Sequence, residues 1–211
     1  MDPDQRARVV MQVADLYTAG LREHGTASKA VGWRDRASQW LRFEKLAAVV
    51  DHPSAAGFTV NDLGCGYAAM FRYLTDRFGD ALSGYRGYDV SEPMLAAARA
   101  FAADPRAEFV QATRVTEDAD YSFVSGTFNV KFGASDAQWT EYVDSMVLDM
   151  AARSTRGLAF NLLTTDVDWR EPHLYYGDPS HFLNFCRRHV SRNVTLLHDY
   201  PLYEWTILVR K

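Results

Sequence analysis

Apolar residues recur along the chain at two different spacings. Near the start they follow one face of a helix, as in Val9, Val10, Val13, Leu16 and Tyr17. From residue 58 onward, short apolar runs alternate with segments of helical spacing, which is the pattern of strands joined by helices. The pattern predicts helices at 4–19, 39–50, 68–78, 92–103, 136–153 and 179–190, and strands at 58–63, 86–89, 108–111, 121–125, 158–163, 194–198 and 203–209.

Polar residues mark where several of these helices begin. Ser91, with Pro93 two residues later, is a favourable start for one helix, and Asp178 for the last one. Asp136 is the expected cap of the helix between them. Residues 20–38 are mixed in character, contain glycine, and are interpreted as a loop with one short turn.

The order of the elements predicts how the strands pair. The earlier strands are separated by helices and are expected to be parallel. The last two are joined by a short turn at Pro201 and must be antiparallel. This predicts a Rossmann-like, doubly wound α/β sheet with a terminal antiparallel hairpin. We expect residues 1–211 to form one domain, in which residues 1–40 make an N-terminal helical lid.

Composition narrows the class of protein. The 211 residues carry 23 basic and 27 acidic side chains, and the net charge of −4 disfavours a nucleic-acid partner. Cys65, Cys186 and the six histidines show no metal-ligand spacing, so no metal is expected. The pattern shows neither a signal peptide nor an apolar run of membrane-spanning length. We therefore expect a cytoplasmic protein.

A glycine-rich turn carries the most informative motif. The strand at 58–63 leads through Asp62 into Gly64 and Gly66, which turn the chain into a helix. Glycine permits the sharp turn and lets a ligand approach the backbone, beside the free N–H groups of the helix start. The next strand ends in Asp89, whose carboxylate can accept hydrogen bonds from a ribose diol. Together these strand ends predict a nucleoside-binding site.

Other nucleotide ligands fit this turn less well. With Ala69, the glycines also match the G-x-G-x-x-A pattern of nicotinamide enzymes. However, the chain contains no Tyr-x-x-x-Lys pair and no G-x-x-x-x-G-K-[ST] motif of ATP sites. Asp62 would place negative charge beside a pyrophosphate. The same acid suits a ligand that carries an amino group and a sulfonium.

The two motifs resemble those of a known family. Asn-Asp-Leu-Gly-Cys-Gly at 61–66 and Tyr-Arg-Gly-Tyr-Asp-Val-Ser-Glu-Pro-Met-Leu at 85–95 are similar to the first two motifs of class I S-adenosylmethionine-dependent methyltransferases. The resemblance covers most of the chain from about Gln39 onward. It implies a seven-stranded sheet with one antiparallel strand, and S-adenosyl-L-methionine as the cofactor.

The resemblance also implies roles for individual residues. Gly64 and Gly66 would pass under the methionine part, Asp89 would hold the ribose and Asp62 would lie near the amino-acid end. The chain departs from the family pattern at two positions. Ala68 replaces a third glycine, and Gln111 replaces the acid that the family often places near the adenine amine. The remaining cofactor candidates are Val90, Met94, Gln111, Ala112 and Ser125, together with Phe128 in the loop after the fourth strand, whose ring could face a cation or fill the core.

Residues before the glycine turn add two candidates for the cofactor site. Gln39 and Arg42 are three apart and share a helix face. A guanidinium can bind a carboxylate through two hydrogen bonds, so Arg42 is the candidate for the methionine carboxylate. Tyr17 and His24 of the expected lid could reach the same pocket, although Tyr17 suits core packing equally well.

Candidate catalytic residues follow the fourth and fifth strands. Asn129 could orient a nucleophile or bind an α-amine, and the alternative is that it caps a turn. Tyr175 and Tyr176 lie in a long aromatic loop and could surround a sulfonium or bind an acceptor. His173 and His198 are possible bases, although a lone histidine is more often structural.

Three functions are compatible with these residues. The first is methyl transfer to an oxygen or nitrogen atom of a small-molecule partner, which requires mainly orientation of the reactants. The second keeps the cofactor but lets its α-amine attack its own Cγ, giving azetidine-2-carboxylate and methylthioadenosine, as in methyltransferase-like azetidine synthases. The third is a non-catalytic nucleoside-binding subunit. The sequence leaves the acceptor and the oligomeric state open.

Overall fold

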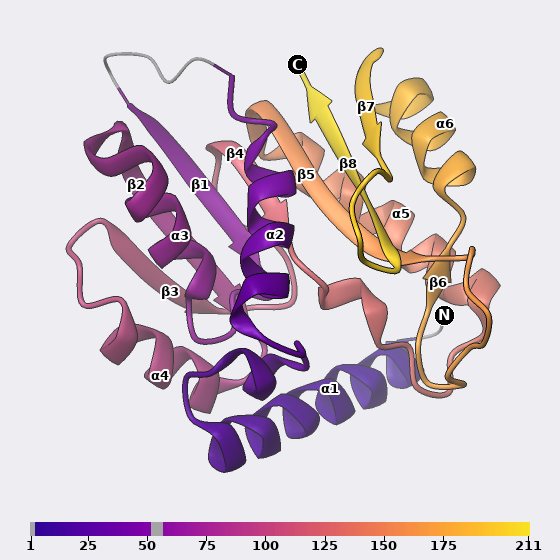
Figure 1. Ribbon diagram of the computed structural model, residues 1–211, viewed down its shortest axis with the longest axis horizontal. Helices are drawn as coiled ribbons and strands as arrows, with labels where there is room; N and C mark the ends of the chain where they lie inside the picture. The colour runs from indigo at the N-terminus through magenta and orange to yellow at the C-terminus, as the bar shows by residue number, and fades with distance from the viewer. Residues whose placement is uncertain (1–2, 52–56) are drawn as a thin grey trace.

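The structure is a computed structural model that describes residues 3–51 and 57–211, and its centre is a mixed sheet (Figure 1). Seven strands run in the order β3-β2-β1-β4-β5-β8-β7, and the short β6 pairs with β5. β8 is antiparallel to β5 and β7, and the other pairs are parallel. This confirms the doubly wound sheet and its terminal hairpin. The strands are β1 Phe58–Leu63, β2 Leu82–Asp89, β3 Ala107–Gln111, β4 Ala119–Val124, β5 Ser154–Thr164, β6 Tyr176–Gly177, β7 Asn193–Leu197 and β8 Glu204–Arg210.

Helices cover both faces of the sheet and one of its ends. α2, α3 and α4 pack on one face, and α5 and α6 pack on the other, each over its own apolar cluster. α1 lies across the end where the parallel strands finish (Figure 1). The helices are α1 Pro3–His24, α2 Arg36–Ala47, α3 Ala69–Phe78, α4 Glu92–Phe101, α5 Asp136–Ala152 and α6 Pro179–His189, with short 3₁₀ turns η1 Ser28–Val31, η2 Gly79–Ala81 and η3 Thr127–Asn129.

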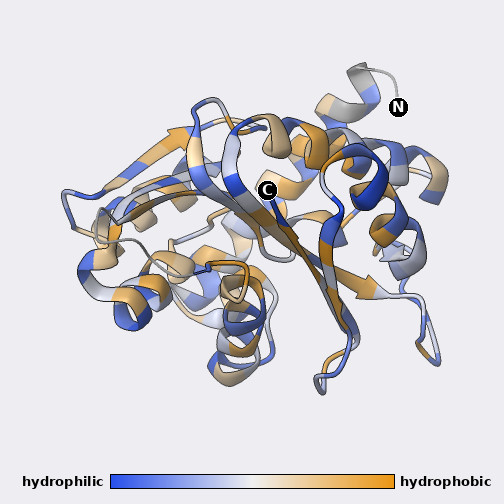
Figure 2. Cartoon of the chain, turned by 90° about the horizontal axis from the view of Figure 1, so that it is seen from above, coloured by the Kyte–Doolittle hydropathy of each residue, from blue (hydrophilic) through white to orange (hydrophobic). Residues whose placement is uncertain are grey.

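The central strands are buried on both sides, as helices on both faces require. Viewed from above, apolar residues line the strands and the helix sides that face them (Figure 2). β8 is buried from Glu204 to Val209, yet it begins with a carboxylate and contains Thr206. β5 contains the buried polar residue Asn161. These polar groups inside the sheet require hydrogen-bond partners.

The ends of the elements differ from the predictions in places. α1 continues through Gly20, which is expected to start a loop, and ends at His24. A Cβ on Gly20 would lie 2.5 Å from Ala30 O, so the glycine lets the backbone of η1 pack closely against α1. α2 begins at Arg36 rather than Gln39, because Asp35 caps it by accepting a hydrogen bond from Ser38 N at 2.7 Å.

Two of the three predicted caps are confirmed and one is wrong. Ser91 accepts from Met94 N at 3.3 Å, and Asp178 caps α6 through Ser180 N. The cap of α5 is Ser135 instead of Asp136. Ser135 Oγ accepts from Gln138 N at 3.3 Å, and Gln138 Oε1 accepts from Ser135 N at 3.2 Å, a reciprocal capping box.

In the part of the chain that the structure describes, no helix is both long enough and apolar enough to cross a membrane.

Candidate functional site

A cavity lies where the strands β1, β2 and β4 end, under α1. The space between its walls, including the open mouth, is about 1160 Å³. Most of its wall is aliphatic or aromatic. The lining residues are Val9, Val10, Val13, Tyr17, Val31, Trp33, Gln39, Phe43, Asp62, Leu63, Gly64, Cys65, Gly66, Tyr67, Ala69, Met70, Asp89, Val90, Met94, Ala112, Thr113, Ser125, Gly126, Thr127, Phe128, Trp139 and Tyr142.

The glycine turn after β1 forms one side of this cavity. Gly64 has a φ of +77°, and its N–H donates to Tyr88 O at 2.7 Å. A Cβ on Gly64 would overlap the side chain of Thr127, whose hydroxyl donates to Leu63 O at 3.1 Å. The loops after β1 and β4 therefore meet at a position that only glycine can occupy.

Asp89, at the end of β2, is tied to the same turn. One carboxylate oxygen accepts from Gly66 N at 3.0 Å, and the other accepts from Ser91 N at 2.9 Å. Burial raises the pKa of Asp89, while these backbone hydrogen bonds oppose the rise. The turn and the carboxylate are thus held together at the cavity, as the spacing of Gly64 and Asp89 predicts.

Asp62 is a second carboxyl group in the cavity wall and is almost fully buried. It accepts a hydrogen bond of 2.5 Å from the hydroxyl of Tyr85. Burial, together with the charge of Asp89, raises the pKa of Asp62 to about 7, although the Tyr85 hydrogen bond lowers it. A positively charged ligand group beside Asp62 would favour the ionised carboxylate.

Ser125, directly after β4, presents an unusual hydroxyl. Its Oγ is buried, and among the described residues it has no hydrogen-bond partner. Leaving a buried hydroxyl unpaired costs about 1–3 kcal/mol. Because Ser125 lines the cavity, a polar atom of a ligand is the natural partner of this hydroxyl.

The N-terminal part of the chain supplies the opposite wall. Tyr17 of α1 lines the cavity, and burial, with a contribution from the charge of Asp89, raises the pKa of its phenol to about 12. The hydroxyl therefore stays protonated and can donate. Gln39 also lines the cavity and accepts from the Tyr67 hydroxyl at 3.3 Å. His24 lies at the end of α1 beside Glu23 and does not line the cavity.

The structure corrects the role expected for Arg42. Its guanidinium does not line the cavity, because both carboxylate oxygens of Glu204 hold it at 2.9 Å from Nε. A second donor, Nη1, donates to Ser38 O at 2.8 Å. The pairing with Glu204 brings together residues 162 positions apart, so it could not be anticipated from the helix face alone.

The residues expected to be catalytic also lie outside the cavity lining. Asn129 is buried, and its Oδ1 accepts from Leu163 N at 3.2 Å, which fastens η3 to β5. The Tyr175 hydroxyl bonds the Thr140 hydroxyl at 2.7 Å, and the Tyr176 hydroxyl accepts from Glu171 N. These contacts correct the expectation that Tyr175 and Tyr176 surround a sulfonium, because the polar atoms of these side chains bond β5, α5 and the loop before β6 instead.

The structure also corrects the cofactor-binding role expected for Gln111. Its side chain is exposed and donates to Val90 O at 3.1 Å, and it does not line the cavity. The lining instead continues through Ala112 and Thr113. His173 and His198, considered as bases, are likewise exposed and do not line the cavity.

Sequence reasoning missed an aromatic group contributed by α5. Trp139 and Tyr142 line the cavity with their ring centroids 4.8 Å apart, and Trp139 Nε1 donates to Phe128 O at 2.7 Å. The helical spacing of Val9, Val10 and Val13 in α1 is evident from the sequence, but that spacing does not show that these valines line the cavity. Within residues 3–51 and 57–211, no group of three or more His, Cys, Asp or Glu residues is placed to hold a metal ion.

Comparison with known proteins relates the chain to one family. A family model described as "Methyltransferase domain" matches residues 60–157. The "Putative methyltransferase Rv1506c" of Mycobacterium tuberculosis is 44% identical over 161 residues, which cover 75% of this chain and 96% of that protein.

Solved structures share the fold at low identity. Magnesium protoporphyrin IX methyltransferase from Synechocystis PCC 6803, with bound SAH, has a TM-score of 0.66 and 14% identity, covering 98% of this chain and 99% of that chain. A SAM-dependent methyltransferase from Leishmania major has a TM-score of 0.65 and 14% identity, covering 96% of this chain and 82% of that chain. At these identities the likeness concerns the fold alone.

Proposed function

The chain belongs to the class I S-adenosylmethionine-dependent methyltransferases, and we propose that it transfers the methyl group to an oxygen or nitrogen atom of an uncharged small molecule. The proposal is carried by the lining of the cavity. Among the described residues, that lining contains no Lys, Arg, His or Glu side chain. Its ionisable groups are two aspartates, one cysteine and three tyrosines.

The residues of the cavity fit the cofactor in the places that its chemistry needs. We assign Asp89 to the ribose hydroxyls, and Gly64 and Gly66 to the backbone surface under the methionine part. Asp62 suits the positively charged amino-acid end. The unpaired hydroxyl of Ser125 supports this assignment, because it offers a hydrogen bond within the same wall.

The remaining cofactor residues are assigned by their place beside Asp89. Val90 and Met94 follow β2 and line the cavity, and Ala112 follows β3. Their apolar side chains suit the faces of an adenine ring. Phe128 and Gln39 line the same cavity from η3 and α2.

The charge of the lining indicates the class of acceptor. A carboxylate or phosphate ester would enter a cavity that is lined by Asp89 and the buried Asp62 and by no cationic side chain of the described residues. Like charges in a poorly solvated site repel strongly. An uncharged acceptor avoids this cost and gains contact with the valines of α1 and the aromatic rings of α5.

Catalysis in such a site depends on positioning. The bound sulfonium supplies an activated methyl group, so the chain must orient the acceptor in line with it and exclude water. α1 lies across the ends of the parallel strands (Figure 1), and its valines line the cavity with apolar surface. Among the described residues, no histidine lines the cavity to act as a general base. This favours acceptors whose nucleophilic atom needs little help from a base.

Matched pairs of acceptors test the proposal. Phenols and anilines would each be compared with their ring carboxylates, with methyl transfer followed by mass spectrometry. We expect transfer to the uncharged members and at least about tenfold slower transfer to the carboxylates. Faster transfer to the carboxylates would contradict the acceptor class.

Two controls accompany this experiment. Asp89→Asn should weaken S-adenosylmethionine binding by about 1–3 kcal/mol, because it removes a charged acceptor for the ribose hydroxyls. Incubation of the enzyme with S-adenosylmethionine alone should leave the cofactor intact. Methylthioadenosine formed without an acceptor would favour cyclisation over methyl transfer.

A further inference from the structure

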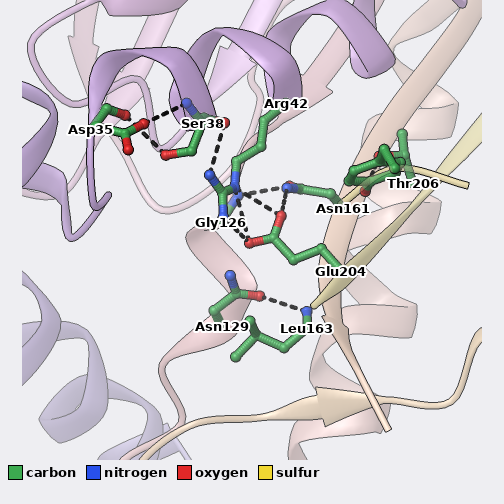
Figure 3. Close-up of polar contacts among 10 residues, drawn as sticks. Asp35, Ser38, Arg42, Gly126, Asn129, Asn161, Leu163, Glu204 and Thr206 are labelled. Carbon is green, nitrogen blue, oxygen red and sulfur yellow. Dashed lines mark hydrogen bonds and ion pairs between the residues drawn. The ribbon is translucent and has the colours of Figure 1, made fainter. Parts of the chain in front are cut away.

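A buried polar network joins α2, β5 and β8 behind the wall of the cavity (Figure 3). Arg42 Nη2 donates to Glu204 Oε1 at 2.6 Å, and Arg42 Nε lies 2.9 Å from both oxygens of that carboxylate. Asn161 Nδ2 donates to Glu204 Oε2 at 2.7 Å. The exposed fractions of the Arg42 and Glu204 side chains are 9% and 1%. A complete charge pair is therefore held inside the protein.

Stability alone does not explain why a charge pair occupies this place. Removing two charges from water is costly, and apolar residues of similar volume often serve the fold equally well. Ion pairing offers instead a fixed geometry, because the planar guanidinium directs several hydrogen bonds at once. Here those bonds reach Ser38 O on α2 and the carboxylate at the start of β8.

Both ends of the network reach residues that line the cavity. The guanidinium carbon of Arg42 lies 3.8 Å from the centre of the Trp33 ring, in a cation–π contact. At the other end, Asn161 Oδ1 accepts from Gly126 N at 2.8 Å. Trp33 and Gly126 both line the cavity, whereas Arg42, Asn161 and Glu204 do not.

The two lining residues also touch each other. A Cβ on Gly126 would overlap the Trp33 ring, and Gly126 has a φ of +73°. The indole thus lies against the bare backbone of the loop after β4. One network therefore fixes both partners of a contact that joins the N-terminal part of the chain to the sheet.

We propose that Arg42, Glu204 and Asn161 are positioning residues that hold Trp33 against Gly126 and so preorganise the cofactor-binding wall. Without the network, Trp33 and the Gly126 loop would have to be ordered when the cofactor binds, which lowers affinity. The inference rests on the cofactor occupying this cavity. Calorimetry of the unaltered protein with S-adenosylmethionine tests that premise separately.

The principal test replaces the charge pair without leaving a lone buried charge. In the double variant Arg42→Met, Glu204→Leu, we expect the dissociation constant for S-adenosylmethionine to rise about tenfold. We also expect acrylamide to quench the fluorescence of Trp33 more strongly. The Trp33 contribution is obtained by subtracting the signal of the same variants in a Trp33→Phe background.

A matched control uses another ion pair. Arg86 Nε lies 2.9 Å from Glu108 Oε2 between β2 and β3, and neither residue lines the cavity. Arg86→Met, Glu108→Leu should leave cofactor affinity and Trp33 quenching unchanged. The proposal is overturned if the Arg42–Glu204 double variant matches this control in both measurements, even when its melting temperature is lower.

A second variant keeps the test decisive if the double variant does not fold. Arg42→Lys retains the charge opposite Glu204 but loses the flat guanidinium over Trp33. We expect stronger quenching of Trp33 and weaker cofactor binding in this variant too. Wild-type values in a folded Arg42→Lys protein would exclude a positioning role for the stacked guanidinium.

Discussion

At the scale of the residue, burial sets the chemistry of the cavity. Asp62 is the second-to-last residue of β1 and accepts a hydrogen bond from the Tyr85 hydroxyl. Burial raises the pKa of Asp62 to about 7, well above the ordinary value of 3.8. In the unfolded chain the same carboxyl returns to the ordinary value. The folded, ligand-free protein therefore favours the protonated form of Asp62, while a cationic ligand favours the ionised form.

This difference predicts how the stability of the ligand-free protein depends on pH. The stabilisation due to Asp62 is fully present below its unfolded pKa and is lost as the pH rises through about 7. Asp62→Asn removes the titrating group and keeps its size. Between about pH 5 and pH 8, we expect the melting temperature of the wild type to fall relative to that of Asp62→Asn. Parallel curves for the two proteins would contradict the raised pKa.

At the scale of the element, short-range hydrogen bonds decide where helices begin. α5 starts at a capping box of Ser135 and Gln138, whereas the sequence pattern predicts Asp136 as the cap. Only one residue can occupy the position before the first helical turn with extended backbone, and Ser135 does so at φ −70° and ψ 156°. Asp136 then contributes only its charge near the helix start.

The assignment of this cap can be measured. Ser135→Ala removes the acceptor of Gln138 N, and we expect it to lower the free energy of unfolding by about 1 kcal/mol. Asp136→Ala keeps the capping box and should cost about half as much or less. Urea denaturation of the two variants distinguishes them. A larger loss for Asp136→Ala would mean that the helix begins one residue later.

At the scale of the whole molecule, the cavity is shared by segments far apart in the chain. α1 contributes Val9, Val13 and Tyr17, while the sheet contributes the turn after β1 and the loop after β4. α1 is also tied to α4, because the hydroxyls of Thr18 and Ser91 lie 2.8 Å apart. A ligand in the cavity contacts all of these parts and should stabilise them together.

Binding should therefore protect α1 as well as the sheet. At a ligand concentration of 100 times the dissociation constant, S-adenosylhomocysteine should stabilise the protein by about 2.7 kcal/mol. We expect amide hydrogen exchange to slow across residues 9–17 of α1 and around Gly64. Thermal shift and exchange mass spectrometry measure both effects. Protection confined to the sheet would show that α1 does not cover the bound ligand.

The sequence by itself determined the alternation of strands and helices, the antiparallel terminal hairpin, the glycine turn and the acid at the end of the next strand. Hydrophobic periodicity and turn chemistry depend on residues that are close in sequence. The positions of Gly64, Gly66 and Asp89 at strand ends follow from this local pattern. This is why the sheet, the hairpin and the meeting of the glycine turn with Asp89 could be predicted.

Only the tertiary structure decided which side chains face the cavity. Arg42 and Tyr175 suit a ligand as isolated residues, but Glu204 and Thr140 take up their polar atoms. A buried polar group binds whichever partner the fold brings near it, and Glu204 arrives from 162 residues away. Periodicity carries no information about such distant pairs, so the cavity wall formed by α1 and α5 and the Arg42–Glu204–Asn161 network emerged only from the packing of the helices on the sheet.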